Sequence, residues 1–346
     1  MSILNIFATS PAFEITTLTD AIQSLKFVPG RISELGIFTE KGIPTTTAAI
    51  EERGGILVFV PPSPRGGPGM TVDKLKRTLR VVSIPHFQID DTMMAEEVQG
   101  VRAWGQETAV EMLMEKVAER GQIFTQSFAQ TEELARLGAI KGLVTYADGT
   151  TLDLRTLFNV TAYPTQFLNL LPGTPTSPGT LRRTVQSLWR LIADELGGLP
   201  FSGIRAFCGN QFFDDLIQAP DVRTTYLNWQ AAAELRGSYG TANQKYYAAY
   251  EFGGITWENY RGFGPDGTPL VPTDLCYLIP EGVPGLFQTY RAPADYIETV
   301  NTNGQRMYVK QYPMPNDKGI NMEFQMNALS ICTRPRLLLT GSRLAS

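Results

Sequence analysis

Histidine and cysteine are scarce in this sequence, and their scarcity limits the chemistry that it can support. His86 is the only histidine, and the three cysteines, Cys208, Cys276 and Cys332, lie far apart without a CxxC pair. Zinc sites and Ser-His or Cys-His catalytic pairs draw on clusters of these residues. We therefore expect no metal site, and we interpret His86 as a structural residue. The cysteine spacing is typical of a reducing compartment, although it leaves room for one disulfide.

Charge and long apolar runs are also lacking. Charged residues make up only 18% of the 346 residues, and the formal net charge is −4. Proteins bind the phosphates of nucleic acid through clustered Lys and Arg, and this sequence has no such cluster, so nothing in it predicts nucleic-acid binding. No run of about 18 apolar residues could span a membrane and the N-terminus lacks a signal-peptide pattern, so we expect cytosolic synthesis and no membrane partner. A chain this poor in charge often covers part of its surface with other subunits.

The motifs of common enzymes are missing too. Residues 262–267 spell GxGxxG, but Pro265 and Pro269 disfavour the helix that a dinucleotide site needs. Adjacent acids on a helix point apart, so we interpret the carboxylate pairs as solvated side chains rather than acid–base pairs. These pairs are Asp90-Asp91, Glu96-Glu97, Glu132-Glu133 and Asp214-Asp215. We predict no catalytic and no cofactor-binding residues; an α/β enzyme is kept as an alternative for which the sequence shows no site.

The most regular pattern is an apolar stripe between Gly105 and Gly138. Its apolar side chains recur at helical spacing, and no proline interrupts it. The pattern predicts a helix over 105–138 with Gly138 as its C-terminal stop. Such a helix would reach about 45–50 Å and could support sheets along its length, although an ordinary core helix of a large enzyme is the alternative. Gly121 lies on the apolar face, where its missing side chain would allow close approach by another element.

Extended arms are the second feature of the chain. Residues 1–40 mix apolar and polar residues without a long period, and such an arm needs a surface to cover its apolar side chains. A Pro/Gly-rich tip over 61–69 separates extended stretches over 54–60 and 74–87. We interpret these stretches as a long β-hairpin. A hairpin of this size usually lies against another surface, and a surface hairpin of its own domain is the alternative.

Turn and cap signals divide the rest of the chain into short elements. Asp148-Gly149 predicts a hairpin within 139–158, and residues 170–183 are a candidate boundary or mobile loop. Asn210 is a candidate N-cap for a helix over 211–218, and Asp221 for a helix that starts at Val222. The remaining predictions are a helix over 184–195 closed by Gly197-Gly198, strands over 204–208, 252–262 and 274–284, and two long extended stretches within 306–341 about a Pro-Asn-Asp-Lys-Gly turn.

Four stretches, together with the long helix, carry a family resemblance. They are GGILVFVPPSPRGGPG with KLKRTLRVVSIPHF, AIKGLVTYADGTTLDL, IRAFCGNQFFDDLIQAPDVRTTYLNW and YVKQYPMPNDKGINMEFQMNALSICTRPRLLL. The sequence resembles the major capsid protein E family of tailed phages, and the last two stretches are the more specific. The resemblance implies an α+β chain with the Hong Kong 97-like phage capsid fold. It also implies a major capsid protein that self-assembles into hexamers and pentamers of the icosahedral shell around a double-stranded DNA genome. An encapsulin-like compartment protein of the same fold is the alternative, and neighbouring portal and terminase genes would separate the two.

The resemblance further implies a division of the chain into the parts of that fold. These are an N-terminal arm over 1–40, an E-loop hairpin over 41–87, a P-domain over 88–165 with its spine helix over about 105–138, an A-domain over 166–302, P-domain strands and the P-loop over 303–326, and a C-terminal strand over 327–346 that returns to the A-domain.

Contacts between subunits are implied at the hairpin and at the P-loop turn. The residues concerned are Pro62, Arg65, Gly67, Lys74, Arg77, Asn316, Asp317 and Lys318. Gly121 would be a flex point of the spine helix during maturation. Some relatives seal their shells with a Lys–Asn isopeptide bond, but no glutamate suited to it can be named, so we expect a decoration protein instead of a cross-link. The other implied partners are further copies of the chain, scaffold and portal proteins, and packaged DNA bound without sequence specificity; assembly in the host cytoplasm would give the capsid of a virion.

Overall fold

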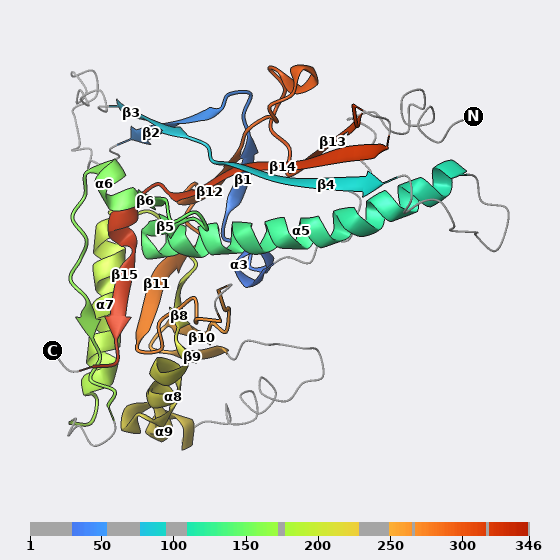
Figure 1. The fold of residues 1–346 in the computed structure, drawn as a ribbon. Helices are drawn as coiled ribbons and strands as arrows, with labels where there is room; N and C mark the ends of the chain where they lie inside the picture. Colours follow the sequence, from blue (N-terminus) through green and yellow to red (C-terminus); the bar gives the residue numbers. More distant parts are fainter. Residues whose placement is uncertain are drawn as a thin grey trace, which may run out of the picture. The chain divides into compact units, whose positions relative to one another are not determined.

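The computed structural model describes residues 30–53, 77–94, 109–171, 177–227, 249–264, 267–315 and 318–344 (Figure 1). The chain divides into two compact units. The first takes Met1–Ile50, Val81–Arg136 and Gln288–Ser330, and the second takes Glu51–Arg80, Leu137–Phe287 and Ile331–Ser346, each as far as its residues are described. None of the described helices is long and apolar enough to cross a membrane.

A five-stranded sheet forms the centre of the first unit. Its strands are β1 (Thr39–Gly42), β12 (Phe287–Arg291), β14 (Gly319–Cys332), β13 (Tyr308–Pro313) and β4 (His86–Met94). β1 runs parallel to β12, whereas β13 and β4 both run antiparallel to β14, on either side of its first half. Most of β14 is buried, because it has neighbouring strands along its length. The two long extended stretches predicted about the Pro-Asn-Asp-Lys-Gly turn are thus confirmed as β13 and β14.

The predicted long helix is present as α5 (Ala109–Lys141), which spans 33 residues. Val117, Phe124 and Phe128 of its apolar stripe pack against β4, β13 and β14, and the rings of Phe124 and Phe324 lie 4.8 Å apart. Figure 1 shows α5 running beside β4. The predicted start at Gly105 lies outside the described residues.

The prediction that Gly138 ends this helix is wrong. The helix continues to Lys141, and Gly142, with φ +86°, adopts the left-handed conformation that ends it. Gly138 has a different role, because a Cβ atom there would lie 2.7 Å from the Cα of Val144. The glycine therefore lets the strand that follows the helix fold back against it.

The N-terminal elements of the described chain are short. They are α3 (Arg31–Glu34), β1, β2 (Thr47–Arg53) and β3 (Arg77–Ser83), and β2 pairs with β3. The predicted hairpin stretch over 54–60 and its tip lie outside the described residues. The predicted arm over 74–87 is not one strand, because β3 ends at Ser83 and β4 starts at His86. Pro85 lies between them, and a proline has no N–H to donate to a strand ladder.

A six-stranded mixed sheet forms the centre of the second unit. Its order is β7 (Gln166–Phe167), β15 (Leu339–Ser342), β11 (Leu275–Glu281), β8 (Gly203–Cys208), β10 (Ile255–Asn259) and β9 (Ala249–Phe252). The helices of this unit are α6 (Leu154–Phe158), α7 (Thr180–Leu196), α8 (Asn210–Gln218) and α9 (Pro220–Leu227), beside the short hairpin β5 (Leu143–Thr145) and β6 (Thr151–Asp153). Phe207, Phe212 and Trp257 are fully buried in the core. Two 3-10 turns, η2 (Ile297–Thr299) in the first unit and η3 (Pro335–Leu337) in the second, complete the described elements.

The turn signals of the sequence are mostly confirmed in this unit. Gly149 adopts φ +82° in the β5–β6 hairpin, and Gly197 adopts φ +62° at the end of α7. α7 nevertheless starts at Thr180, four residues before the predicted start at 184. The predicted strand over 252–262 is interrupted by a turn at Gly253 and Gly254, which joins β9 to β10 as a hairpin.

The two cap predictions are wrong in an informative way. Asn210 is already the first helical residue of α8, and its N-cap is Gly209, whose missing side chain avoids the backbone of Pro272. Asp221 lies within α9, but its carboxylate accepts hydrogen bonds from the backbone N–H groups of Gly179 at 2.8 Å and Leu181 at 3.1 Å. Asp221 therefore caps the N-terminus of α7, a helix that begins about forty positions earlier in the chain.

Candidate functional site

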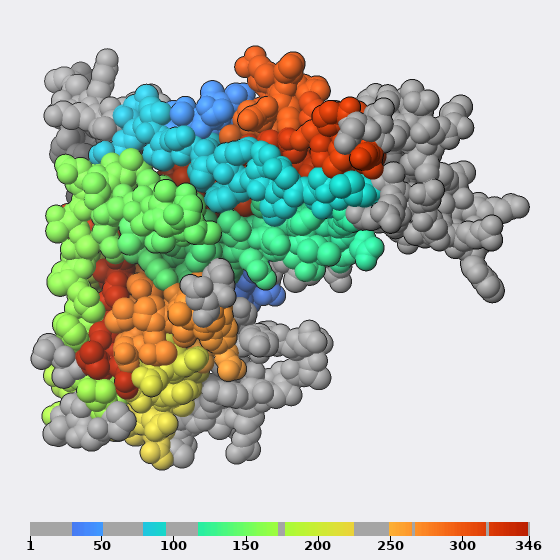
Figure 2. Space-filling view, viewed as in Figure 1, coloured from blue at the N-terminus to red at the C-terminus, as the bar shows by residue number. Residues whose placement is uncertain are grey.

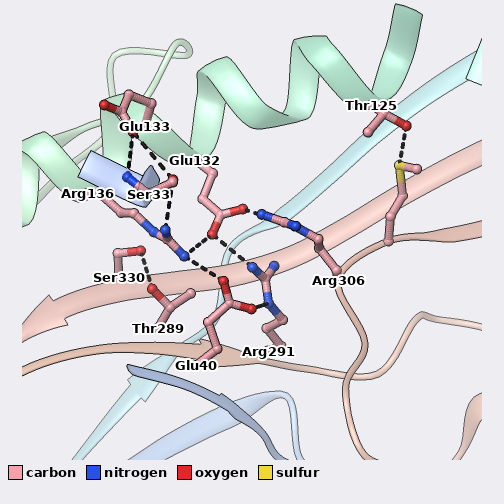
Figure 3. A network of polar contacts seen from close by, with 11 residues as sticks. Ser33, Glu40, Thr125, Glu132, Glu133, Arg136, Thr289, Arg291, Arg306 and Ser330 are labelled. Atoms are coloured by element: carbon pink, nitrogen blue, oxygen red, sulfur yellow. Dashed lines mark hydrogen bonds and ion pairs between the residues drawn. The ribbon is translucent and has the colours of Figure 1, made fainter. Parts of the chain in front are cut away.

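A buried network of ion pairs lies in the first unit, between α5 and the sheet (Figure 3). Glu132 of α5 pairs with Arg136 one turn later in the helix and accepts a hydrogen bond from Arg291 of β12 at 2.8 Å. Glu40 of β1 bridges the same two arginines, at 2.8 Å from Arg136 and 2.9 Å from Arg291. Arg306 adds a longer contact to Glu132 at 4.0 Å. The network thus ties together a helix and two strands that are far apart in sequence.

Glu133 extends this network to the first described residues of the chain. Its carboxylate accepts hydrogen bonds from the backbone N–H of Ile32 at 2.7 Å and of Ser33 at 3.4 Å, and Arg136 donates to the hydroxyl of Ser33 at 2.8 Å. A Cβ atom at Gly30 would lie 2.4 Å from the Glu133 carboxyl, so a larger residue there would displace that side chain from its present contacts. Glu133 therefore satisfies the orphan N–H groups at the start of α3 and holds that segment against α5.

The prediction that Glu132-Glu133 is a solvated pair is therefore wrong. Only 2% of Glu132 and 8% of Glu133 is exposed. The two side chains do point apart, as adjacent residues on a helix must, but each meets its own set of buried partners. The four-residue spacing of Glu132 and Arg136 was the available sequence signal for a helical ion pair. Nothing in the sequence pointed to Glu40, Arg291 or Arg306, because these partners come from distant segments.

The electrostatics of the network favour the charged forms of Glu40 and Arg291. Burial would raise the pKa of Glu40, but the hydrogen bonds and charges of Arg291 and Arg136 outweigh it and lower that pKa from 4.5 to about 2. Burial likewise would lower the pKa of Arg291, but Glu132 and Glu40 outweigh it and raise that pKa. For Arg306, burial prevails and lowers the pKa. Two carboxylates, Glu40 and Glu132, thus face the guanidinium groups of Arg136, Arg291 and Arg306.

This network can hold segments together but offers little for catalysis. Its cations are guanidinium groups, which stay protonated, and its carboxylates are already paired with them. Among the described residues, no three His, Cys, Asp or Glu side chains converge in a way that could hold a metal ion. The ring nitrogens of His86 lie 2.8 Å from the Oδ1 of Asn327 and 3.2 Å from the Oε1 of Gln88, so His86 lies in a polar contact between β4 and β14.

The other sequence motifs occupy ordinary surroundings. Gly264 donates its N–H to the carbonyl of Thr268 at 2.8 Å, so the described part of the GxGxxG segment is a tight turn. Asp91 pairs with Arg120 at 2.8 Å, and Asp215 with Arg343 at 2.7 Å, so these two acids are not simply solvated as the sequence had suggested. Glu96-Glu97 lies outside the described residues.

Most of the predicted contact residues cannot be placed. Pro62, Arg65, Gly67, Lys74, Asn316 and Asp317 lie outside the described residues, and Arg77 is described only as the first residue of β3. Lys318 is exposed just before β14. Gly121 is buried within α5, which continues through it, and its carbonyl accepts a hydrogen bond from Thr125 at 2.6 Å. Contact roles for these residues remain predictions.

A surface feature that the sequence did not indicate is the loop between β12 and β13, where Ile297 is 90% and Val300 63% exposed. The Thr299 hydroxyl shares its one proton between the carbonyls of Ala294 at 2.7 Å and Tyr296 at 3.0 Å, and this contact supports the turn η2 that carries the two side chains. Lys310 pairs with Glu298 at 3.1 Å on the same loop. Figure 2 shows this orange segment at the surface. The loop therefore holds two apolar side chains in water.

The comparisons with known proteins agree on one family. The family model described as phage major capsid protein E matches residues 14–342 of the chain. The major capsid protein of Pseudomonas phage KPP10 is 27% identical over 350 residues, which cover 95% of this chain and 96% of that protein. The major capsid protein of Salmonella phage Felix O1 is 26% identical over 358 residues, covering 94% and 95% of the two chains.

A solved structure supports the same fold. The crystal structure of a protein assigned as a prophage capsid protein in Escherichia coli CFT073 matches with a TM-score of 0.53, and the match covers 96% of this chain and 99% of that one. The sequence identity is 13%, so this likeness concerns the fold alone.

Proposed function

The chain belongs to the phage major capsid protein E family, and from this membership we propose that its copies form hexamers and pentamers, which close into an icosahedral head around double-stranded DNA. The chain is a structural component of a tailed-phage capsid, not an enzyme, and its place is the virion. Its fold is the Hong Kong 97-like capsid fold with mixed α/β content.

The observation that carries the assembly proposal is the rigid apolar loop at η2. Ile297 at 90% and Val300 at 63% exposure lie close together on one loop, and the Thr299 hydroxyl, bonded to the carbonyls of Ala294 and Tyr296, supports the turn that presents them. In a shell, each such contact recurs between many copies, so even a weak one adds up. We propose that a second copy of the chain covers Ile297 and Val300.

The finer division of the fold belongs to the same proposal. We assign residues 1–40 to an N-terminal arm, 41–87 to an E-loop hairpin, 88–165 and 303–326 to the P-domain, and 166–302 with 327–346 to the A-domain. The shared core of α5, β4, β13 and β14 supports grouping 88–165 with 303–326. The compact units divide the chain at Gln288 rather than at 303, and residue-level subunit contacts would decide between the two boundaries.

The remaining proposals concern contacts and partners. We propose that Pro62, Arg65, Gly67, Lys74 and Arg77 contact a neighbouring subunit through the hairpin, as do Asn316, Asp317 and Lys318 through the P-loop. We propose scaffold, portal and decoration proteins as further partners and no covalent cross-link between subunits. Denaturing gels of mature heads test the last point, because ladders above the 38.2 kDa monomer would contradict it.

Negative-stain microscopy of the purified full-length chain tests the central proposal. We expect hexamers, pentamers or closed shells as the protein concentration rises. A chain that stays monomeric at every concentration, with and without a co-expressed scaffold, would contradict it. Comparing immature and expanded shells by cryo-electron microscopy tests Gly121 as the flex point of α5, and identical helices in both states would reject that role.

A further inference from the structure

Two of the three cysteines lie directly opposite one another in the core of the second unit. β8 and β11 are antiparallel, and their register pairs Cys208 with Cys276. Both residues are 0% exposed, and both are reduced in this structure. Directly opposed residues of an antiparallel pair project to the same face of the sheet, so the two thiols are neighbours. They lie 68 positions apart in the sequence, so their spacing gave no sign of this pairing.

The hydrogen-bond pattern shows which kind of cross-strand pair this is. Hydrogen-bonded and non-hydrogen-bonded pairs alternate along an antiparallel ladder. The N–H of Gly209 donates to the carbonyl of Leu275 at 2.9 Å, so the next pair, Cys208 and Cys276, is non-hydrogen-bonded. Pro280 opposite Ile204 falls in the same class, as it must, because proline has no N–H.

Non-hydrogen-bonded pairs suit a disulfide. Their Cα atoms lie about 4.5 Å apart, the closer of the two cross-strand spacings, and disulfides span Cα distances of about 4.4–6.8 Å. Because Cys208 and Cys276 are directly opposed in the register, their thiols lie on the same face of the sheet, where the Cys208 thiol donates a weak hydrogen bond to the carbonyl of Ala206 at 3.7 Å. On the other side of β11, Gly341 of β15 stands opposite Cys276, and a Cβ atom there would lie 2.6 Å from the Cys276 sulfur. In the reduced structure the Cys276 sulfur thus lies toward Gly341, and it turns toward Cys208 when the bond forms.

We propose that Cys208 and Cys276 form a latent disulfide site, reduced in the host cytoplasm and oxidised by small-molecule disulfides once the virion is outside. A thiolate of one cysteine attacks a sulfur of oxidised glutathione and releases one glutathione thiolate. The thiolate of the other cysteine then displaces the second glutathione. The protein pair loses two electrons and two protons, and one oxidised glutathione becomes two reduced ones.

The surroundings of Cys208 and Cys276 determine how fast the two thiols are oxidised. Burial and the neighbouring Cys276 thiol raise the pKa of Cys208, so little of it is thiolate at neutral pH. The mixed disulfide with glutathione is also too large for a site with no exposure. Oxidation therefore proceeds through local opening of β8 from β11 and is slow at pH 7, and it is faster at pH 9. The bond that results links the two central strands of the sheet and stabilises the second unit against unfolding.

Peptide mapping of the full-length protein tests this proposal. The purified protein is incubated with oxidised glutathione at pH 9, its remaining thiols are alkylated, and it is digested without reduction. We expect one peptide pair linked through Cys208 and Cys276, with Cys332 alkylated. We also expect a rise in the thermal midpoint of roughly 5–10 °C that dithiothreitol reverses.

Two variants sharpen the test. Cys276→Ala removes one partner and should abolish both the linked peptides and the rise in thermal midpoint. Cys332→Ala is the matched control, because Cys332 is equally buried, and it should retain both. The proposal is overturned if Cys208 and Cys276 of the wild-type protein stay alkylatable after oxidation in about 2 M urea, which lowers the free energy of opening the sheet. It is also overturned if Cys332 provides one end of the bond. The wild-type peptide map decides the question even if Cys276→Ala does not fold.

Discussion

At the scale of single residues, Glu132 holds together segments that are far apart in the sequence. It is 2% exposed and pairs with Arg136 and Arg291, both also buried. Glu132→Gln would remove the more deeply buried of the two carboxylates that Arg136 and Arg291 share, and Glu40 would remain as the other. We expect the free energy of unfolding to fall by about 3–5 kcal/mol, because a buried ion whose partner is removed cannot regain its hydration.

Urea unfolding of the purified chain measures this loss. Glu119→Gln is the matched control, because Glu119 is an exposed glutamate on the same helix. Its effect should stay within about 0.5 kcal/mol. If Glu132→Gln and Glu119→Gln lowered the free energy of unfolding equally, the buried network would contribute no more to stability than an exposed glutamate does.

Glu40 gives the same network a dependence on pH. Its pKa is lowered to about 2 in the folded chain, below its value of 4.5 in the unfolded chain. The stabilisation is therefore complete above pH 4.5 and is lost as the pH falls toward 2. The wild-type chain should exceed Glu40→Gln in unfolding free energy at pH 6, and this advantage should shrink at pH 3. A constant difference between the two chains across that range would contradict the shift.

The sequence could not have predicted this network as a whole. Glu132 and Arg136 stand at helical spacing, which local reasoning can recognise. Their partners Glu40 and Arg291 lie on strands β1 and β12, which only the fold brings together. The pairing of Cys208 with Cys276 was hidden for the same reason, since it depends on strand register.

At the scale of elements, local signals predicted the presence of helices and strands better than their ends. The apolar stripe fixed α5 because periodicity persists over many turns, and Asp148-Gly149 fixed a hairpin because the turn needs a positive φ. The end of α5 and the cap of α7 depend on tertiary contacts. Gly138 was therefore wrongly predicted to end α5, and Asp221 was wrongly predicted to cap the helix that contains it.

Gly138→Ala tests the role that packing gives to this glycine. Alanine favours a helix by about 1 kcal/mol over glycine, but its Cβ would lie 2.7 Å from the Cα of Val144 and 3.1 Å from the carbonyl oxygen of Leu143. Backbone atoms cannot give way easily, so overpacking by roughly 2–3 kcal/mol should outweigh the gain. We expect a net loss of about 1–2 kcal/mol in urea unfolding. Gln122→Ala, at an exposed site on the same helix, should change stability little, and a stabilised Gly138→Ala chain would refute the packing role.

Asp221→Ala tests the cap of α7. The substitution leaves the N–H groups of Gly179 and Leu181 without their carboxylate, so we expect a loss of about 1–2 kcal/mol. Asp214→Ala is the control, since Asp214 is an exposed aspartate on the neighbouring helix α8. Hydrogen exchange should locate the loss of protection in the first turn of α7. A loss confined to α9, which contains Asp221, would instead mean that the carboxylate serves its own helix.

At the scale of the whole molecule, the chain has two compact units, each with its own sheet, and a family whose members build capsids. Folding buries most apolar residues of both sheets, although Met94, Tyr312 and Phe167 on their strands stay partly exposed, and it leaves Ile297 and Val300 in water. We propose that assembly covers them, since the Thr299 hydroxyl supports the turn that holds them at the surface. A substitution in the loop at η2 should therefore weaken assembly without changing the stability of the isolated subunit.

Ile297→Asp makes that disturbance. The side chain is 90% exposed in the isolated chain, so its thermal midpoint should not change. At a contact between copies, however, the substitution would bury an unpaired carboxylate, and repetition around the shell multiplies the penalty. We expect at least about a tenfold loss of sedimenting particles, whereas Ile297→Leu, which stays apolar, should assemble like the wild-type chain. If Ile297→Asp and the wild-type chain yield equal numbers of shells in the ultracentrifuge and by microscopy, the loop at η2 faces solvent in the head, and another surface must join the subunits.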